Sequence, residues 1–127
     1  MIYKFYQQRI FPHLLNQVMQ IPSMMEKRRE LLLPIQGEVL EIGFGTGLNL
    51  PFYQAVDSVY ALEPNSEIFP LAQQRIVDAP FHVKHVQSWA EKLPFADESI
   101  DHIVSTLTLC NIANLETALA EIYRVLK

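Results

Sequence analysis

Apolar residues recur at steps of three and four along the first twenty positions, the spacing of one face of an α-helix. These residues are Ile2, Phe5, Tyr6, Ile10, Phe11, Leu14, Leu15, Val18 and Met19. Because proline lacks an amide hydrogen and its ring clashes with the preceding turn, Pro12 predicts two helical pieces, with Pro12 in the first turn of the second. Ser23 and Glu26 have capping-box spacing, so another helix is expected from residue 23 to about residue 33.

Strand and helix patterns alternate over the rest of the chain. We expect strands at residues 38–42, 58–62, 81–86 and 100–109, and helices at residues 66–77, interrupted near Pro70, and 114–126, capped by Asn114. This order is typical of βαβ units, so the sequence predicts an α/β fold with a doubly wound parallel sheet. The pattern stops after the last helix and leaves the fourth strand at a sheet edge. We therefore expect either a fragment of a larger domain or a homodimer through that edge.

Composition narrows the class of protein. The chain has 127 residues, of which 50% are hydrophobic and 19% charged, so it is long enough for one domain with a core. A net charge of −4, with the basic residues mostly scattered, argues against a nucleic-acid partner. The one cysteine, Cys110, cannot form an internal disulfide, and we expect a cytoplasmic protein in which it is structural. No apolar run approaches the roughly 20 residues of a membrane-spanning helix, so we expect no stable membrane insertion.

A glycine-rich turn between residues 39 and 50 is the most informative stretch. A strand pattern runs into Gly43, Gly45 and Gly47, and a short helix is expected after them. Glycines let the backbone turn tightly and approach a ligand, while free amides at a helix start favour polar or negatively charged groups. A plain tight turn explains one glycine better than three. We therefore interpret the turn as the cradle of a small molecule.

Glu63 follows the second expected strand, 20 residues after Gly43 (63 − 43 = 20). In dinucleotide-binding folds an acidic residue at about this spacing accepts hydrogen bonds from ribose hydroxyls. The sequence thus indicates a ligand that contains adenosine. Nicotinamide or flavin dinucleotides and S-adenosylmethionine remain the two choices at this point.

The glycine spacing favours the second choice. Gly43, Gly45 and Gly47 alternate with other residues, whereas the dinucleotide fingerprint is G-x-G-x-x-G. With Glu41 before them, they resemble motif I of the class I S-adenosylmethionine-dependent methyltransferases. Residues 90–101 and 118–127 resemble two later motifs of the ubiquinone-biosynthesis-like methyltransferases, and residues 44–53 and 105–110 resemble a branch with phospholipid and thiol methyltransferase-like proteins.

The resemblance implies a fold, a cofactor and a partner. The fold would be Rossmann-like, with strands in the order 3-2-1-4 and without the last three strands of the family. Residues 1–127 would form a single, incomplete methyltransferase domain, with an N-terminal helical lid at 1–36 and the cofactor-binding half at 37–127. The cofactor would be S-adenosyl-L-methionine, and the partner a small-molecule or lipid-like acceptor.

The resemblance also implies a set of cofactor-binding residues: Glu41, Gly43, Phe44, Gly45, Thr46, Gly47, Asn49, Glu63, Pro64, Trp89, Ala90, Thr106 and Tyr6. The three glycines would line the methionine and ribose part, and Glu63 would hold the ribose hydroxyls. The other roles follow the family in the same way. Glu41 would hold the amino group, Pro64 and residues 88–91 would border the adenine, Thr106 would contact the methionine end, and Tyr6 of the lid would reach the carboxylate.

Two alternative functions that do not involve methyl transfer stay open. The chain would be either a non-catalytic cofactor-binding fragment or interaction subunit, or a fragment of a dinucleotide-binding oxidoreductase. No residue is assigned as a catalytic base, because methyl transfer from a sulfonium can rely on positioning and water exclusion. His13, His82, His85 and His102 lack the spacing of a metal motif, so no metal is expected.

Overall fold

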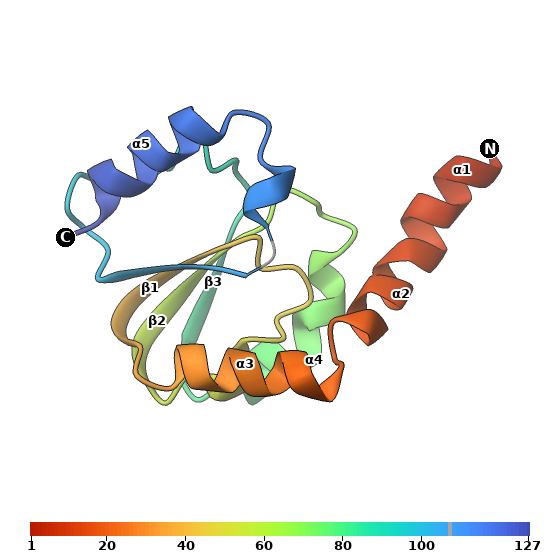
Figure 1. Cartoon of the computed structure of the whole chain (residues 1–127), viewed down its shortest axis with the longest axis horizontal. Helices are drawn as coiled ribbons and strands as arrows, with labels where there is room; N and C mark the ends of the chain where they lie inside the picture. Colours follow the sequence, from red (N-terminus) through yellow and green to blue (C-terminus); the bar gives the residue numbers. More distant parts are fainter. Residues whose placement is uncertain (107) are drawn as a thin grey trace.

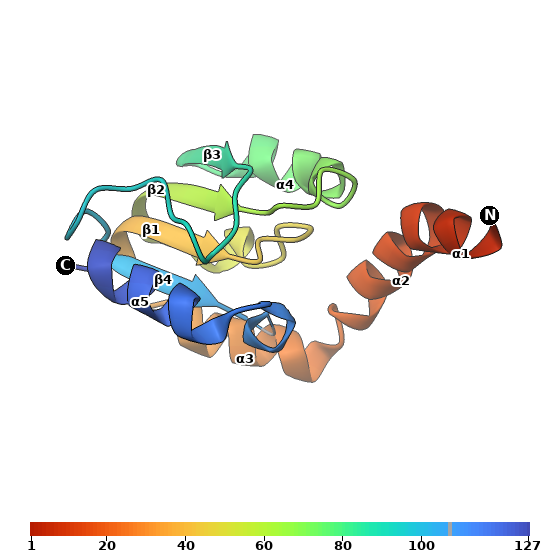
Figure 2. The same cartoon turned by 90° about the horizontal axis from the view of Figure 1, so that it is seen from above.

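A four-stranded parallel sheet organises the chain in the computed structural model, which describes residues 1–106 and 108–127 (Figures 1 and 2). The strands are β1 (Gln36–Ile42), β2 (Ala55–Leu62), β3 (His82–Val86) and β4 (His102–Ser105). Their order is β3-β2-β1-β4, and all three pairings are parallel. The predicted strand order 3-2-1-4 is therefore confirmed, with β4 at one edge of the described sheet.

Helices cover both faces of this sheet (Figure 1). Helices α3 (Pro22–Leu32) and α4 (Gln73–Asp78) lie against one face, and α5 (Leu115–Val125) lies against the other. Because successive strand side chains point to opposite faces, Val39 belongs to the core under α3 and Leu40 to the core under α5. The three layers form the predicted Rossmann-like α/β fold.

The N-terminal segment is one continuous helical rod that projects away from the sheet (Figures 1 and 2). It comprises α1 (Ile2–Phe5), a π-helical turn (Tyr6–Ile10) and α2 (Phe11–Val18). The two predicted α-helical pieces are present, with Pro12 in the first turn of α2, but a π-helical turn joins them without a break in the rod. The backbone N–H of Phe11 donates to the carbonyl of Tyr6, and this wider π turn accommodates the proline that follows. Within the described residues, no helix combines the length and apolar character needed to cross a bilayer.

Two further boundaries differ from the prediction. Helix α3 begins at Pro22, and its N-cap Ile21 makes no side-chain bond, so the capping box at Ser23 is wrong. Proline has a φ suited to the first helical position, which places Ser23 already inside the helix. Strand β4 stops at Ser105, which pairs with Ile42, because β1 turns away after that pair. Leu107, in the predicted continuation of the strand, lies outside the described residues.

The other two expected helices differ in how closely the structure agrees with the prediction. The predicted interruption near Pro70 is confirmed: a 3₁₀ turn at Phe69–Ala72 precedes α4, which covers only the second part of the predicted helix 66–77. Helix α5 has the predicted N-cap, since Asn114 Oδ1 accepts the backbone N–H of Thr117 at 3.1 Å.

Helix α5 also fixes the loop that leads into β4. The Glu121 carboxylate accepts the backbone N–H of Leu93 at 2.8 Å and bonds to the Arg124 guanidinium, which donates to the carbonyls of Leu93 and Phe95. The hydrogen bonds from Arg124, followed by that from Leu93, lower the pKa of Glu121 to about 2. One ion pair therefore ties the loop to the helix beneath it.

We predict that Glu121→Gln lowers the free energy of unfolding by about 1 kcal/mol at pH 7, the typical size of a hydrogen bond with a partly exposed charge. Because folding depresses this pKa, the stabilisation is present above about pH 4.5 and is lost as the pH falls toward 2. Urea unfolding at several pH values measures the difference. The difference in unfolding free energy between wild type and Glu121→Gln should therefore shrink as the pH falls. Glu116→Gln, an exposed change in the same helix, is the control, and its difference from wild type should not shrink in this way.

Candidate functional site

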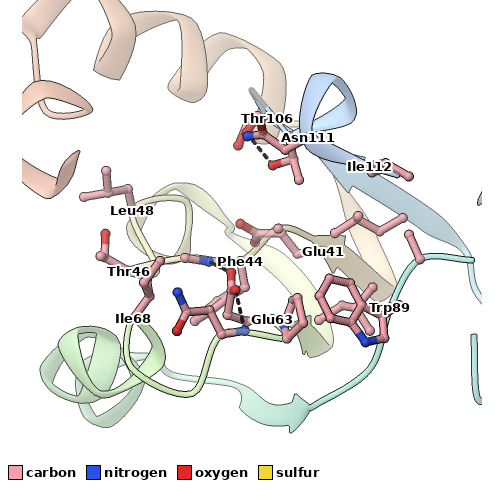
Figure 3. Close-up of a pocket in the computed structure, with 18 of the residues that line it drawn as sticks. Glu41, Phe44, Thr46, Leu48, Glu63, Ile68, Trp89, Thr106, Asn111 and Ile112 are labelled. Atoms are coloured by element: carbon pink, nitrogen blue, oxygen red, sulfur yellow. Dashed lines mark hydrogen bonds between the residues drawn. The ribbon is translucent and has the colours of Figure 1, made fainter. Parts of the chain in front are cut away.

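A cavity of about 630 Å³ opens at the carboxyl ends of β1, β2 and β4 (Figure 3). Ligands of open α/β sheets bind at this end of the strands. The glycine loop after β1, the turn after β2 and residues 88–91 contribute walls, as do residues 111–113 after β4. In Figure 3, Trp89 and Ile112 lie on one side of the cavity, and Thr46, Leu48 and Ile68 on the other.

The glycine loop presents backbone toward this cavity. Gly43 and Gly45 have φ values of 73° and 58°, in the left-handed region that favours glycine. A Cβ on Gly43 would overlap the Thr108 side chain, whereas a Cβ on Gly45 would meet no atom closer than 3.9 Å. Arg75 of α4 anchors the loop by donating to the Thr46 carbonyl at 3.0 Å. Gly43 therefore serves the fold, and Gly45 leaves room beside the cavity.

Glu63 joins the glycine loop to the turn after β2. Its side chain is only 7% exposed, and its two carboxylate oxygens each accept one backbone N–H at 2.9 Å, from Gly45 and from Asn65. The His85 ring lies beneath the turn, with Nε2 3.0 Å from the Glu63 carbonyl oxygen, and stacks on Phe69 at 3.7 Å between centroids. Each carboxylate oxygen has a second lone pair, so Glu63 can still accept hydrogen bonds from a ligand.

A buried polar network lies at the end of β1. Glu41 is 1% exposed and accepts hydrogen bonds from Asn49 Nδ2 at 2.7 Å and from the Tyr53 hydroxyl at 2.9 Å. Arg28 Nη1 donates to Asn49 Oδ1 at 2.7 Å and to Thr106 Oγ1 at 3.2 Å. The network thus connects α3, β1, the glycine loop and the end of β4.

Burial dominates the acid–base behaviour of these groups. It raises the pKa of Glu41 to about 7, against the hydrogen bonds of Tyr53 and Asn49 and the charge of Arg28, which lower it. Burial and the neighbouring Glu41 also raise the pKa of Tyr53, so its hydroxyl remains a donor. Burial lowers the pKa of Arg28, and the charge of Glu41 partly offsets this by raising it. Near neutral pH, therefore, Glu41 is poised between its neutral and ionised forms.

The structure brings most of the predicted cofactor residues to the cavity wall. These are Glu41, Gly43, Phe44, Gly45, Thr46, Glu63, Pro64, Trp89, Ala90 and Thr106. Gly47 is outside the wall, and a Cβ there would lie 3.1 Å from Phe44 and 3.2 Å from Ala72, so this glycine permits packing. Asn49 is also outside and holds Glu41 instead.

Tyr6 is the third predicted residue that does not line the cavity. It lies in the projecting N-terminal rod, where its ring is 6.1 Å from that of Phe11, and 38% of its surface is exposed. Its contact with the cofactor carboxylate stays a prediction.

Sequence reasoning missed several wall residues, above all Arg28. Arg28 looked like part of the basic run at residues 27–29, but it is 8% exposed while Arg29 is exposed. A signal was present, because Arg28 precedes Leu32 by four residues and shares its helix face. Asn16 and Met19 of the N-terminal segment, and Asn111 and Ile112 after β4, also line the cavity.

The fold and the site define a Rossmann-like α/β protein with a cavity at the carboxyl ends of its strands, and comparison with known proteins specifies the family. Residues 40–127 match the family described as a methyltransferase domain. The chain therefore belongs to the methyltransferase domain family.

Individual relatives agree with this assignment. A thiol S-methyltransferase of Homo sapiens is 31% identical over 134 residues, which cover 92% of this chain and 53% of the relative. A ubiquinone/menaquinone biosynthesis C-methyltransferase of Marinomonas sp. is 36% identical over 95 residues, covering 70% of this chain and 38% of the relative. The crystal structure of a SAM-dependent methyltransferase from Aquifex aeolicus shares the fold, with a TM-score of 0.70 at 24% identity, covering 91% of this chain and 67% of that one. The chain spans about half the length of the thiol methyltransferase.

We predict that replacing Glu41 by the neutral Gln removes a pH dependence of stability. Folding raises the pKa of Glu41 from its ordinary 4.5 to about 7, so its stabilising contribution is complete below pH 4.5 and declines as the pH rises through 7. Wild type should therefore lose stability relative to Glu41→Gln between pH 5 and pH 8, by on the order of 2–3 kcal/mol.

Denaturant unfolding of both proteins at the two pH values measures this change. Glu26→Gln, at an exposed position of α3, is the control and should follow wild type. An equal stability difference between wild type and Glu41→Gln at both pH values would contradict the raised pKa.

Proposed function

We propose that this chain binds S-adenosyl-L-methionine and supplies the cofactor half of a methyltransferase that acts on a small-molecule or lipid-like acceptor. The observation that carries the proposal is the position of Glu63, whose buried carboxylate lies against the open side of the glycine loop. Membership in the methyltransferase family supports the choice of cofactor.

The residues of one end of the cavity fit an adenosine. Glu63 has acceptor capacity for ribose hydroxyls, and the space beside Gly45 lets a sugar approach the backbone. Trp89, Ile68 and Pro64 add aromatic and aliphatic surface for the adenine ring. Trp89 is 67% exposed, so its indole can cover one side of a bound base.

The other end of the cavity fits the amino-acid part of the cofactor. Glu41 and Thr106 line the wall there, and in Figure 3 Thr106 lies beyond Glu41, away from Glu63 and Trp89. A carboxylate attracts an ammonium group, and the ammonium favours the ionised form of Glu41. An elongated ligand with an adenosine at one end and an amino acid at the other matches this division.

Positioning is the catalytic contribution that these residues can make. The bound cofactor supplies an activated methyl group on a sulfonium. Glu63 and the glycine loop would fix the adenosine, while Glu41 and Thr106 would fix the opposite end, so that the methyl group faces one direction. The apolar wall at Leu48 and Ile112 would exclude water from the reaction. The chain offers no group that we assign as a base.

We propose only the class of the acceptor, a small-molecule or lipid-like compound. Relatives of this chain include a thiol S-methyltransferase, a ubiquinone/menaquinone biosynthesis C-methyltransferase and a phosphatidylethanolamine N-methyltransferase. These names describe acceptors that share little chemistry. A homodimer through the free edge of β4 and a cytoplasmic location also stay predictions.

A dinucleotide cofactor is the second candidate, because the strand order and the acidic residue after β2 occur in that class too. The glycine spacing opposes it, since Leu48 stands where G-x-G-x-x-G has its third glycine. Binding measurements with both ligands separate the two candidates.

We predict that the wild-type chain binds S-adenosylhomocysteine and not NAD in calorimetric titration. Glu63→Ala should weaken S-adenosylhomocysteine binding roughly 10- to 100-fold, because hydrogen bonds to a charged group are lost. Glu67→Ala, an exposed change in the same turn, is the matched control and should bind like wild type. Binding of NAD alone, or unchanged affinity in Glu63→Ala, would contradict the proposal.

A further inference from the structure

The N-terminal rod (residues 2–18), which projects away from the sheet (Figure 2), has a row of exposed apolar side chains. This row, here called the apolar stripe, is exposed by 38% to 87% and consists of Ile2, Tyr6, Ile10, Leu14 and Val18. None of the five lines the cavity, although Phe11 and Asn16 of the same rod do. A contiguous exposed apolar surface marks a site of contact with another molecule or with a membrane.

The π turn keeps the apolar stripe closer to one side of the rod. Residues four apart in a regular α-helix differ by about 40° in direction, so a stripe with strict four-residue spacing winds around the helix. The turn at Tyr6–Ile10 has more residues per turn, because the Phe11 N–H bonds to the carbonyl five residues earlier. This reduces the winding, and the rod gains the apolar face of an amphipathic helix.

The rod also differs in charge from the rest of the chain. Residues 1–21 contain Lys4 and Arg9 and no acidic residue, whereas the remainder has eight Lys and Arg against fourteen Asp and Glu, a net charge of 8 − 14 = −6. One open hollow on the rod is lined by Lys4, Arg9, Met1, Phe5 and Gln8. No ion pair among the described residues includes either cation. Apolar surface and positive charge are thus combined in one segment.

We propose that the N-terminal rod binds the surface of an anionic lipid membrane, with the apolar stripe toward the acyl chains and Lys4 and Arg9 toward the lipid phosphates. A helix with an apolar face, aromatic rings and basic residues lies in the plane of such a surface and does not span the bilayer. Tyr3 and Tyr6 have rings with a polar tip, which suits the boundary between lipid and water. Tyr6 would then contact lipid instead of the cofactor carboxylate.

Charge favours a lipid surface over a second copy of the chain as the occupant of the stripe. Two rods packed together would add positive charge to positive charge, and neither has an acidic residue to offset it. An anionic surface attracts the rod and repels the acidic remainder, so contact is confined to the rod. Because Phe11 and Asn16 line the cavity, the cavity would lie close to that surface.

The first measurement is sedimentation of the wild-type chain with lipid vesicles in the absence of cofactor. One set of vesicles is phosphatidylcholine, and the other is an equal mixture of phosphatidylcholine and phosphatidylglycerol. We expect roughly 10- to 30-fold tighter binding to the anionic set, the effect of two cations near a charged surface, and weaker binding as the salt concentration rises. Absence of binding, or equal affinity for both sets, would overturn the inference.

A pair of substitutions tests the apolar stripe. Ile10→Ser with Leu14→Ser should weaken binding to the anionic vesicles by at least roughly 10-fold, because apolar area is lost from the contact. The matched control is Leu115→Ser with Leu119→Ser, which changes two leucines of similar exposure in α5 and should leave binding as in wild type. Equal weakening by both pairs would show that the stripe is not the contact.

A second pair tests the two cations. Lys4→Gln with Arg9→Gln should remove the preference for anionic vesicles, whereas Arg29→Gln with Lys84→Gln, at exposed positions outside the rod, should keep it. If both pairs lower the preference by the same factor, the total charge of the chain is responsible and the inference is wrong.

Sedimentation velocity without lipid tests the second copy as the occupant. A dimer that Ile10→Ser with Leu14→Ser dissociates would overturn the inference, because the stripe would then be an interface between copies. We expect the stripe to make no contribution to self-association. Since the wild-type vesicle comparison needs neither a variant nor a cofactor, its outcome is independent of the proposed function and of whether a variant folds.

Discussion

The buried carboxylate of Glu41 is the constraint on which the rest of the site depends. Its lone pairs must be satisfied although the residue is only 1% exposed, and Asn49 and Tyr53 satisfy them from the loop that follows the glycines. Asn49 in turn accepts from Arg28, so the position of α3 follows from the same requirement. One buried acid therefore sets how the helix, the central strand and the glycine loop meet, and this meeting point is one end of the cavity.

Glu63 plays a different part at the other end. Its carboxylate accepts the backbone N–H groups of Gly45 and Asn65, so it holds the glycine loop in place while it keeps lone pairs for a ligand. The glycines divide in a similar way, since Gly43 makes room for Thr108 and Gly45 leaves room for a ligand. The two acids thus separate the proposed adenosine end of the cavity from its proposed amino-acid end.

The sequence was a good guide where local pattern decides the structure and a poor one where packing decides it. The alternating strand and helix pattern predicted the parallel sheet, and the glycine spacing predicted the loop. The order 3-2-1-4 followed from the resemblance to the family, and the acid at the end of β2 was found from spacing alone. The pattern extended β4 to residue 109 because periodicity does not reveal where β1 turns away. The spacing of Arg28 from Leu32 indicated only its helix face. The hydrogen-bond partners of Asn49 and Arg28 could not be assigned, because they lie 8 to 78 positions away in sequence.

The most direct test of the account is a nuclear magnetic resonance titration of the ¹⁵N-labelled chain with S-adenosylhomocysteine. The account predicts that the backbone amides of Gly45 and Asn65, which donate to Glu63, respond together at one saturating site. The amides of α1 (Ile2–Phe5), far from the cavity, should serve as an unperturbed reference. Saturable binding that leaves Gly45 and Asn65 unchanged, or no response anywhere, would contradict the cofactor site.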